Sequence, residues 1–239
     1  IRDRDNDLFR LALESRSLFP KLCETLQDET GIDIQYQASG LIKIANRPED
    51  VDSLCKQYHF LKSLDDSVVE LSDTDLIHLT NGNVTSSEMA IYIPHDGQIN
   101  ANHYTKALFK SLQQRDIKRY FNTEVTRIEH LNGYYQVETT DGSLYAKKVI
   151  VAGGAWSSQL LKDYHLPREV VGVKGEVLLI ENDDLDLKET VFMTNGCYIV
   201  PKQPNRFLIG ATSEFDNYSV GNTSEGISWL HQLSLIHIS

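Results

Sequence analysis

At 239 residues the chain is long enough for one large or two modest domains, and its 41% hydrophobic residues can fill a core. A formal net charge of -11 without a dense basic cluster argues against nucleic acid and anionic membranes as partners. No apolar run approaches the roughly 18 residues of a membrane span, and the charged N-terminal residues lead us to expect no signal peptide. The widely spaced cysteines suit free thiols in a reducing compartment. We therefore expect a cytoplasmic protein.

The N-terminal part of the chain has the spacing of a helix followed by strands. Leucines at intervals of three, four or seven residues between Leu8 and Leu26 predict a helix that buries one face. Pro20 is expected to kink or restart that helix. The alternating segment Gly31–Tyr36 and the apolar segment Gly40–Ala45 then predict two strands paired as a hairpin.

The middle of the chain predicts helices, a short strand and an antiparallel meander. Pro48 stands near the start of a helix with an acidic first turn, which the helix dipole favours, and Asn100 can cap another helix. Ala90–Ile93 reads as the strand between them. The meander uses the turn Asp141-Gly142. Its strands are Tyr134–Thr139 and Leu144–Ala146, which lead into Val149–Ala152, and Thr123–Ile128 is predicted as a separate strand before it.

A glycine pair after an apolar run is the most informative stretch of the sequence. Val149–Ala152 is typical of a strand buried on both faces, as in a parallel sheet. Gly153 and Gly154 allow a sharp turn with no side chain, and Ser157 or Ser158 can cap a following helix. A ligand that lies at the carboxyl end of a strand needs such a turn. An ordinary tight strand-to-helix turn would have the same sequence, so both interpretations stay open.

The second half predicts an antiparallel sheet. Val170–Ile180 reads as a long strand in which Gly172 and Gly175 mark a bulge or a close neighbour. Cys197–Pro201 and Arg206–Thr212 predict further strands joined by a turn. The expected fold class is therefore mixed, α/β with α+β character, arranged as two interleaved lobes.

Other chemistries have little support in the sequence. The histidines show no metal-ligand spacing such as H-x-x-x-H, and no cysteines pair as C-x-x-C, so we expect no metal site. No G-x-S-x-G elbow is present for a hydrolase.

Taken in order, these segments resemble the D-amino-acid oxidase family of FAD-dependent oxidoreductases, and within it the glycine oxidases of the thiamine-biosynthesis type. Each matching segment is short, and the joint occurrence in this order carries the resemblance. The segments are Gly31–Ile34, Gly40–Ala45, Asp96–Asn100, Val149–Ser157, Val173–Glu176, Cys197–Pro201 and Gly210–Thr212.

The resemblance implies a partial Rossmann-like FAD-binding domain interleaved with a substrate domain built on an antiparallel sheet. On that basis we expect residues 1–30 and 98–165 to belong to the FAD-binding domain. Residues 31–97 and 166–239 are expected to belong to the substrate domain.

The resemblance also implies roles for particular residues. Ala152, Gly153, Gly154 and Trp156 would lie against the flavin. Val125 would present its backbone to the adenosine part of FAD, although an ordinary strand residue is equally compatible with the sequence.

Tyr198 is the candidate catalytic residue. By resemblance its phenol faces the flavin and can donate a hydrogen bond to a substrate carboxylate without adding a charge. An aromatic residue that only packs across strands is the alternative. Gly196 and Ser213 stand where some glycine oxidases carry histidine and methionine, which leaves the choice of substrate open.

The implied reaction is oxidation of glycine or a similar small amino acid. A hydride moves from the α-carbon to the flavin, the imine hydrolyses to an oxo acid and ammonia, and oxygen accepts the electrons to give hydrogen peroxide. A related oxidase or dehydrogenase acting on sarcosine, D-amino acids or another small amine is the alternative enzyme. A flavoprotein-like binding module without cofactor is the alternative outside enzymes. The resemblance leaves a homo-oligomer open.

We expect the chain to be a fragment, because it starts at Ile1 and its last residues follow an unfinished helix. It contains no G-x-G-x-x-G loop, the element that binds the FAD pyrophosphate in this family. The arginine that grips the substrate carboxylate would also lie outside it. The chain alone is therefore expected to bind FAD poorly and to be inactive.

Overall fold

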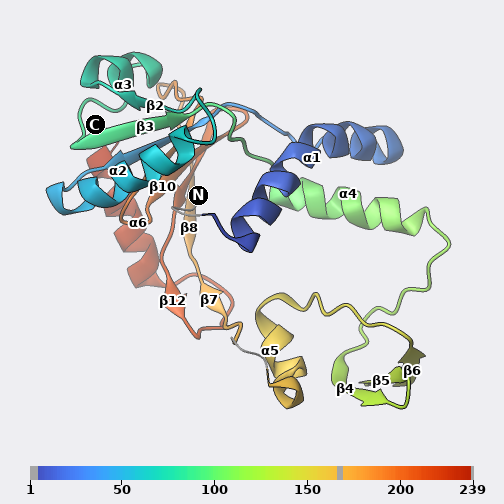
Figure 1. Ribbon diagram of the computed structural model, residues 1–239. Helices are drawn as coiled ribbons and strands as arrows, with labels where there is room; N and C mark the ends of the chain where they lie inside the picture. Colours follow the sequence, from blue (N-terminus) through green and yellow to red (C-terminus); the bar gives the residue numbers. More distant parts are fainter. Residues whose placement is uncertain (1–4, 166–168, 238–239) are drawn as a thin grey trace. The chain divides into compact units, whose positions relative to one another are not determined.

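The computed structural model describes residues 5–165 and 169–237, which form two compact units (Figure 1). The first unit combines the described residues up to Asp116 with Glu176–Ala211 and the segment from Asn222 onward. The second combines Ile117–Gly175 with Thr212–Gly221. The predicted FAD-binding and substrate domains are defined by what they bind, whereas these two units are defined by how the chain packs. The predicted domains therefore stay a prediction.

A seven-stranded sheet is the centre of the first unit, with the strand order β2-β3-β1-β9-β10-β11-β8. Its pairs are antiparallel except that of β1 with β9, where Leu41 lies beside Thr190 in a parallel register. The predicted mixed fold class with a largely antiparallel sheet is confirmed. The strands are β1 (Leu41–Ala45), β2 (Val69–Leu71), β3 (Met89–Ile93), β8 (Val177–Glu181), β9 (Thr190–Met193), β10 (Tyr198–Lys202) and β11 (Arg206–Gly210).

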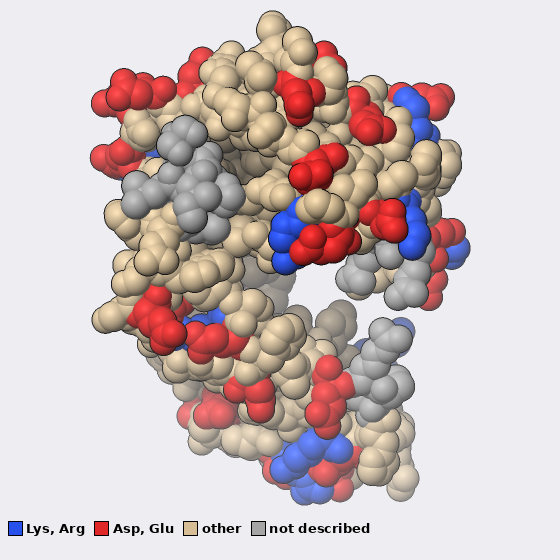
Figure 2. Space-filling model, turned by 90° about the vertical axis from the view of Figure 1, so that its left-hand side faces the viewer, with Lys and Arg blue, Asp and Glu red and all other residues tan. Residues whose placement is uncertain are grey.

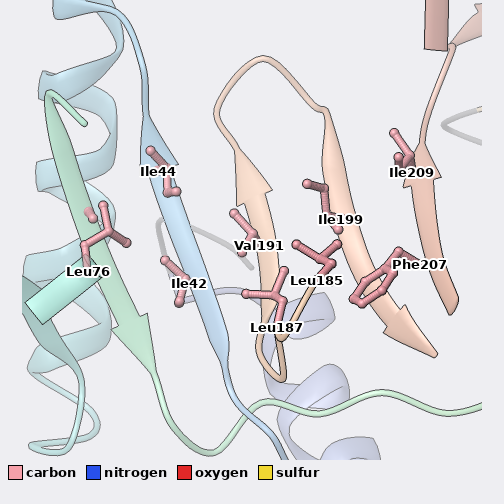
Figure 3. Close-up of a cluster of buried hydrophobic side chains, with 10 residues drawn as sticks. Ile42, Ile44, Leu76, Leu185, Leu187, Val191, Ile199, Phe207 and Ile209 are labelled. Carbon is pink, nitrogen blue, oxygen red and sulfur yellow. The ribbon is translucent and has the colours of Figure 1, made fainter. Parts of the chain in front are cut away.

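One face of this sheet is fully covered by apolar side chains. Alternate residues of neighbouring strands, such as Ile42, Val191 and Ile199, point to that face and are buried. Leu76 of α3 (Asp73–Leu79) and Leu187 of the loop before β9 close over them (Figure 3). Burial of apolar surface contributes about 25 cal/mol per Å² to the free energy of folding. This cluster of buried side chains is a hydrophobic core of the unit.

The other face is covered at its β3 and β1 end. Leu54 of α2 (Pro48–Lys62) and Phe9 of α1 (Asp7–Thr30) pack there with Ile91 and Ile93 of β3. On β8, at the opposite end, Leu179 is 53% exposed. The central strands therefore present a partly open surface between these two ends.

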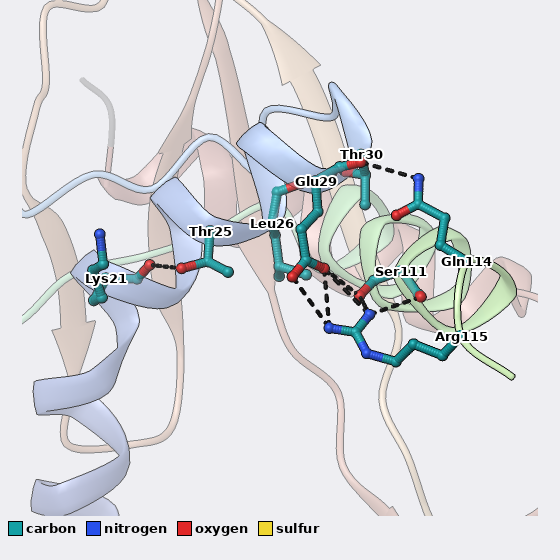
Figure 4. A network of polar contacts seen from close by, with 8 residues as sticks. All are labelled: Lys21, Thr25, Leu26, Glu29, Thr30, Ser111, Gln114 and Arg115. Carbon is teal, nitrogen blue, oxygen red and sulfur yellow. Dashed lines mark hydrogen bonds and ion pairs between the residues drawn. The ribbon is translucent and has the colours of Figure 1, made fainter. Parts of the chain in front are cut away.

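Helix α1 is continuous through Pro20, and its ribbon bends midway in Figure 1. Its last turn packs on α4 (Ala101–Gln113) through buried Leu26 and Ala107. Figure 4 shows the polar contacts beside them, in which the Glu29 carboxylate accepts hydrogen bonds from Ser111 and from the Arg115 guanidinium. These bonds, chiefly that from Ser111, hold the pKa of Glu29 below its ordinary value.

The second unit contains an antiparallel meander, in which the predicted pair of strands Tyr134–Thr139 and Leu144–Ala146 is joined by the separately predicted strand at Thr123–Ile128. Its strands are β4 (Val125–Leu131), β5 (Tyr134–Thr139) and β6 (Gly142–Ala146). It also contains a two-stranded sheet of β7 (Val173–Lys174) and β12 (Glu214–Phe215). Short helical turns lie between these sheets in the sequence: η1 (Gly154–Trp156), α5 (Ser157–Leu160) and η2 (Lys162–Tyr164).

Three sequence predictions about strands are wrong. Gly31–Tyr36 is not a strand of a hairpin, because β1 pairs with β3 on one side and β9 on the other. The predicted strand Val170–Ile180 is divided at Gly175 into β7 and β8, which belong to different sheets. Val149–Ala152 forms no strand, since no described strand pairs with it, and Ile150 is 92% exposed.

A buried carboxylate fixes the start of α6 (Ser224–His237). Glu176 is 2% exposed and accepts hydrogen bonds from the Thr223 backbone N–H at 2.9 Å and from its hydroxyl at 3.2 Å. Negative charge is favoured at a helix N-terminus, where unpaired N–H groups concentrate. Gly226 completes the fit, because a Cβ atom there would lie 1.9 Å from a Glu176 carboxylate oxygen.

The chain carries 34 acidic and 23 basic residues, so its formal net charge is negative. On the face drawn in Figure 2, red acidic side chains are spread widely and blue basic ones occur in small groups. None of the described helices is long and apolar enough to cross a bilayer.

We predict that Gly226→Ala destabilises the first unit by roughly 1–3 kcal/mol, the usual cost of forcing extra atoms into a packed site. Chemical denaturation monitored by circular dichroism measures the change. Ser228→Ala, on an exposed position of the same helix, is the control and should stay within about 0.5 kcal/mol of the parent. Equal midpoints for the two variants would contradict the packing of Glu176 against Gly226.

Candidate functional site

Tyr198 begins β10 on the partly open face of the seven-stranded sheet. Its ring packs on Phe192 of β9, with ring centroids 4.8 Å apart and planes at 30°. The side chain is half-buried, and its hydroxyl has no hydrogen-bond partner among the described residues. A phenol placed in this way can donate a hydrogen bond to a bound molecule.

Burial raises the pKa of Tyr198 above its ordinary value. The phenol therefore stays protonated throughout the physiological range and remains a donor. The ring lies directly over the main chain of Gly210, where an added Cβ atom would be 2.4 Å from Tyr198 Cζ. Only glycine leaves room for the ring in this position.

A row of side chains crosses the sheet through Tyr198. Register partners in neighbouring strands place Ile91, Lys43, Phe192, Tyr198 and Gly210 in that order on the same face. Lys43 is the only charged member, and its ammonium donates to Gln57 Oε1 of α2 at 2.5 Å. Of the residues in this row, Tyr198 alone was predicted from the sequence to have a functional role. A lysine inside the apolar strand Gly40–Ala45 was the available signal for Lys43.

A cavity of about 320 Å³ opens beside this row. Lys43, Thr190, Phe192 and Val200 form its wall on the sheet, and the turn Asp96–Gln98 forms another part of its lining. The wall thus combines apolar surface with one ammonium group and one hydroxyl. Such a mixture suits a small polar ligand.

Gln98 connects the cavity to β10. Its side-chain amide donates to the Pro201 carbonyl at 2.6 Å, and its Oε1 accepts from Lys202 Nζ at 2.6 Å. Burial lowers the pKa of Lys202. These bonds fix the turn at residues 96–98 against the strand that carries Tyr198.

The predicted flavin-contacting turn lies in the second unit. Gly153 leads into η1, where Gly154 has φ +56° and no heavy atom within 4 Å of the position of a Cβ. This conformation favours glycine and leaves bare, accessible main chain. The expected serine cap is wrong, because α5 has no side-chain cap, and the Ser158 hydroxyl instead accepts a bond from the Val170 N–H.

The other predicted cofactor contacts belong to the same unit. Ala152 directly precedes the glycine pair, and Trp156 is 56% exposed, with its ring 6.0 Å from that of Tyr218. Val125 begins β4, opposite Thr139 and next to a bulge. Open main chain beside an exposed indole can accommodate a flat aromatic group such as a flavin. The roles of these residues and of Tyr198 stay predictions.

We predict that Gly210→Ala displaces the Tyr198 ring, because its methyl group and the ring cannot occupy the same space. The expected results are an altered near-ultraviolet circular dichroism spectrum and a stability loss of roughly 1–3 kcal/mol. Gly153→Ala is the control, since its Cβ would meet neighbours only at 3.5 Å or more. An unchanged aromatic spectrum in Gly210→Ala would refute the contact.

Comparison with known sequences finds glycine oxidases among the relatives of this chain. The chain is 38% identical over 207 residues to glycine oxidase of Geobacillus kaustophilus, covering 86% of this chain and 55% of the relative. It is 30% identical over 214 residues to glycine oxidase of Bacillus subtilis, covering 88% of this chain and 56% of the relative. The chain thus spans about half the length of these curated relatives.

Comparison with solved structures also finds a glycine oxidase. The crystal structure of the Geobacillus kaustophilus glycine oxidase matches with a TM-score of 0.89 at 35% identity, over 96% of this chain and 62% of that one. L-proline dehydrogenase from P. horikoshii, at 15% identity, shares the fold with a TM-score of 0.79. The model of the family described as FAD dependent oxidoreductase matches residues 1–234. The predicted resemblance and the FAD cofactor of the family are thereby confirmed, and the chain belongs to the D-amino-acid oxidase family of FAD-dependent oxidoreductases.

Proposed function

We propose that the protein carrying this chain is an FAD-dependent oxidase of glycine or a similar small amino acid. Glycine, oxygen and water would give glyoxylate, ammonia and hydrogen peroxide. The relatives that match at 38% and 30% identity are both glycine oxidases, which supports this substrate class.

The half-buried phenol of Tyr198 is the observation that carries the proposal. A neutral donor without a protein partner can bind a carboxylate oxygen of the substrate. Phe192 and Val200 beside it supply an apolar wall that limits water around the reacting carbon. The residues of this chain therefore bind and orient the substrate and need not supply an acid and a base.

FAD, when bound, would supply the two-electron chemistry by accepting a hydride from the α-carbon. The accessible main chain at Gly153 and Gly154, with Ala152 and Trp156, would hold its isoalloxazine part. Val125 would meet the adenosine part. A side chain at Gly154 would both strain the backbone and occupy the open space.

Oxygen is the electron acceptor in this proposal, and the cytoplasm is the proposed location. Cys23, Cys55 and Cys197 are all free, which suits a reducing compartment. An enzyme acting on sarcosine or D-amino acids is the second candidate, because Gly196 leaves the Tyr198 end of the sheet without a side chain at that position.

The test is a peroxide assay of the complete gene product with FAD, using glycine, sarcosine and D-alanine as substrates. We expect turnover of glycine, and a roughly 10- to 100-fold lower kcat/KM in Tyr198→Phe, since a hydrogen bond to a charged group contributes about 1.5–3 kcal/mol. Tyr145→Phe, an exposed tyrosine of the second unit, is the matched control and should keep the parent value.

Peroxide from D-alanine alone would favour the second candidate. A purified protein that neither shows flavin absorbance nor oxidises any of these amines would favour the cofactor-free binding module. Equal kcat/KM for parent and Tyr198→Phe would remove Tyr198 from the site while leaving the reaction class in place.

A further inference from the structure

The cavity beside Phe192 carries polar groups that the proposed reaction does not use. Thr190 and Lys43 line it on the β9 and β1 side of Phe192, whereas Tyr198 lies on the β10 side. Tyr198 itself is not among the residues that line the cavity. What these polar groups bind is a distinct question from what Tyr198 does.

Thr190 supplies a hydroxyl at the cavity wall. The residue is 8% exposed, and its side chain shares the cavity face with Phe192 because alternate residues of a strand point the same way. Its backbone N–H donates to the Gly40 carbonyl at 3.3 Å, but its hydroxyl has no partner among the described residues. A molecule in the cavity can therefore exchange a hydrogen bond with this hydroxyl.

Lys43 supplies a positive charge at the same wall. It lies two residues from Leu41, the register partner of Thr190, and on the same face of β1. The amide oxygen of Gln57, itself 5% exposed, accepts one hydrogen bond from this ammonium and orients it. Charge-assisted hydrogen bonds from an ammonium favour a carboxylate or another anion.

Two further properties limit the ligand. Asp96 also lines the cavity, and its carboxylate accepts a bond from the Gly97 N–H at 3.1 Å, so the site contains charges of both signs. The volume of about 320 Å³ corresponds to roughly ten water molecules. The charges of both signs match a zwitterion better than a simple anion, and the volume is too small for a large cofactor.

We propose that this cavity is a subsite for a small amino acid, whose carboxylate contacts the Lys43 ammonium and the Thr190 hydroxyl. The subsite lies next to Tyr198 and receives the same class of molecule. The identification of its natural ligand as an amino acid rests on the proposed function. The binding of a small carboxylate rests only on the groups in the cavity.

The test is a titration of the ¹⁵N-labelled chain with glycine, acetate and methylammonium, followed by amide chemical shifts. Glycine and acetate should shift the amides of Thr190 and Phe192 in a saturable way, and methylammonium should not. Lys43→Met is expected to weaken glycine binding about tenfold or more, because about 1.4 kcal/mol corresponds to tenfold and a charge-assisted bond exceeds that. Thr190→Val, of nearly the same shape, should weaken it severalfold.

Lys56→Met is the matched control, since Lys56 is an exposed lysine on α2 and its loss changes the net charge equally. Lys43→Arg should retain part of the binding. Equal weakening in the Lys43→Met and Lys56→Met variants would overturn the proposal, as would glycine shifts confined to other residues. If Lys43→Met fails to fold, unchanged binding in Thr190→Val would overturn it instead.

This experiment needs neither flavin nor turnover, so its result is independent of the test of the proposed function. Oxidase activity of the gene product without these chemical-shift changes would refute the proposed subsite and leave the proposed reaction in place. Saturable chemical-shift changes in a protein that oxidises no amine would refute the proposed reaction and leave the binding of a small carboxylate in place.

Discussion

The parallel pairing of β1 with β9 is the constraint on which the first unit depends. It joins residues 41–44 to residues 190–193, segments almost 150 positions apart, and makes one sheet from strands on both sides of the second unit in the sequence. Every other pair in this sheet is antiparallel. Without this pairing Lys43 would not lie beside Phe192, and neither the row nor the cavity would exist.

The same pairing explains why one face of the sheet packs into the core while the other face can bind a ligand. Ile42 and Val191 become part of a continuous core on one side, while Lys43 and Phe192 turn to the side that helices cover only in part. Polar groups can therefore lie on a rigid, well-buried framework and still face a cavity. A site built on strands in this way holds its groups more accurately than one built on loops.

The sequence was most informative where structure is local. The pairing of β5 with β6 was predicted from the turn Asp141-Gly142, because turn chemistry and strand alternation act over a few residues. Gly172 was expected to have a close neighbour, and a Cβ there would lie 2.8 Å from the Tyr218 ring. The family followed from the order of several short segments, which the matching family model confirms.

The sequence did not predict which distant strands pair with each other. Gly31–Tyr36 has the alternation of a strand, yet β1 has no free edge for it. Val149–Ala152 has the composition of a buried strand, but composition does not provide a pairing partner, and Ile150 is exposed. Thr190 and Phe192 were missed for the same reason, since only the long-range register brings them next to Lys43 and Tyr198.

The row across the sheet keeps Tyr198 as a neutral phenol in a partly apolar setting. An NMR pH titration of the chain labelled with ¹³C at tyrosine Cζ, assigned with Tyr198→Phe, tests it most directly. We expect Tyr198 to ionise with a pKa above the ordinary tyrosine value of about 10, because burial disfavours the phenolate. A pKa of Tyr198 at or below that value would show that the phenol is not held in a partly apolar setting.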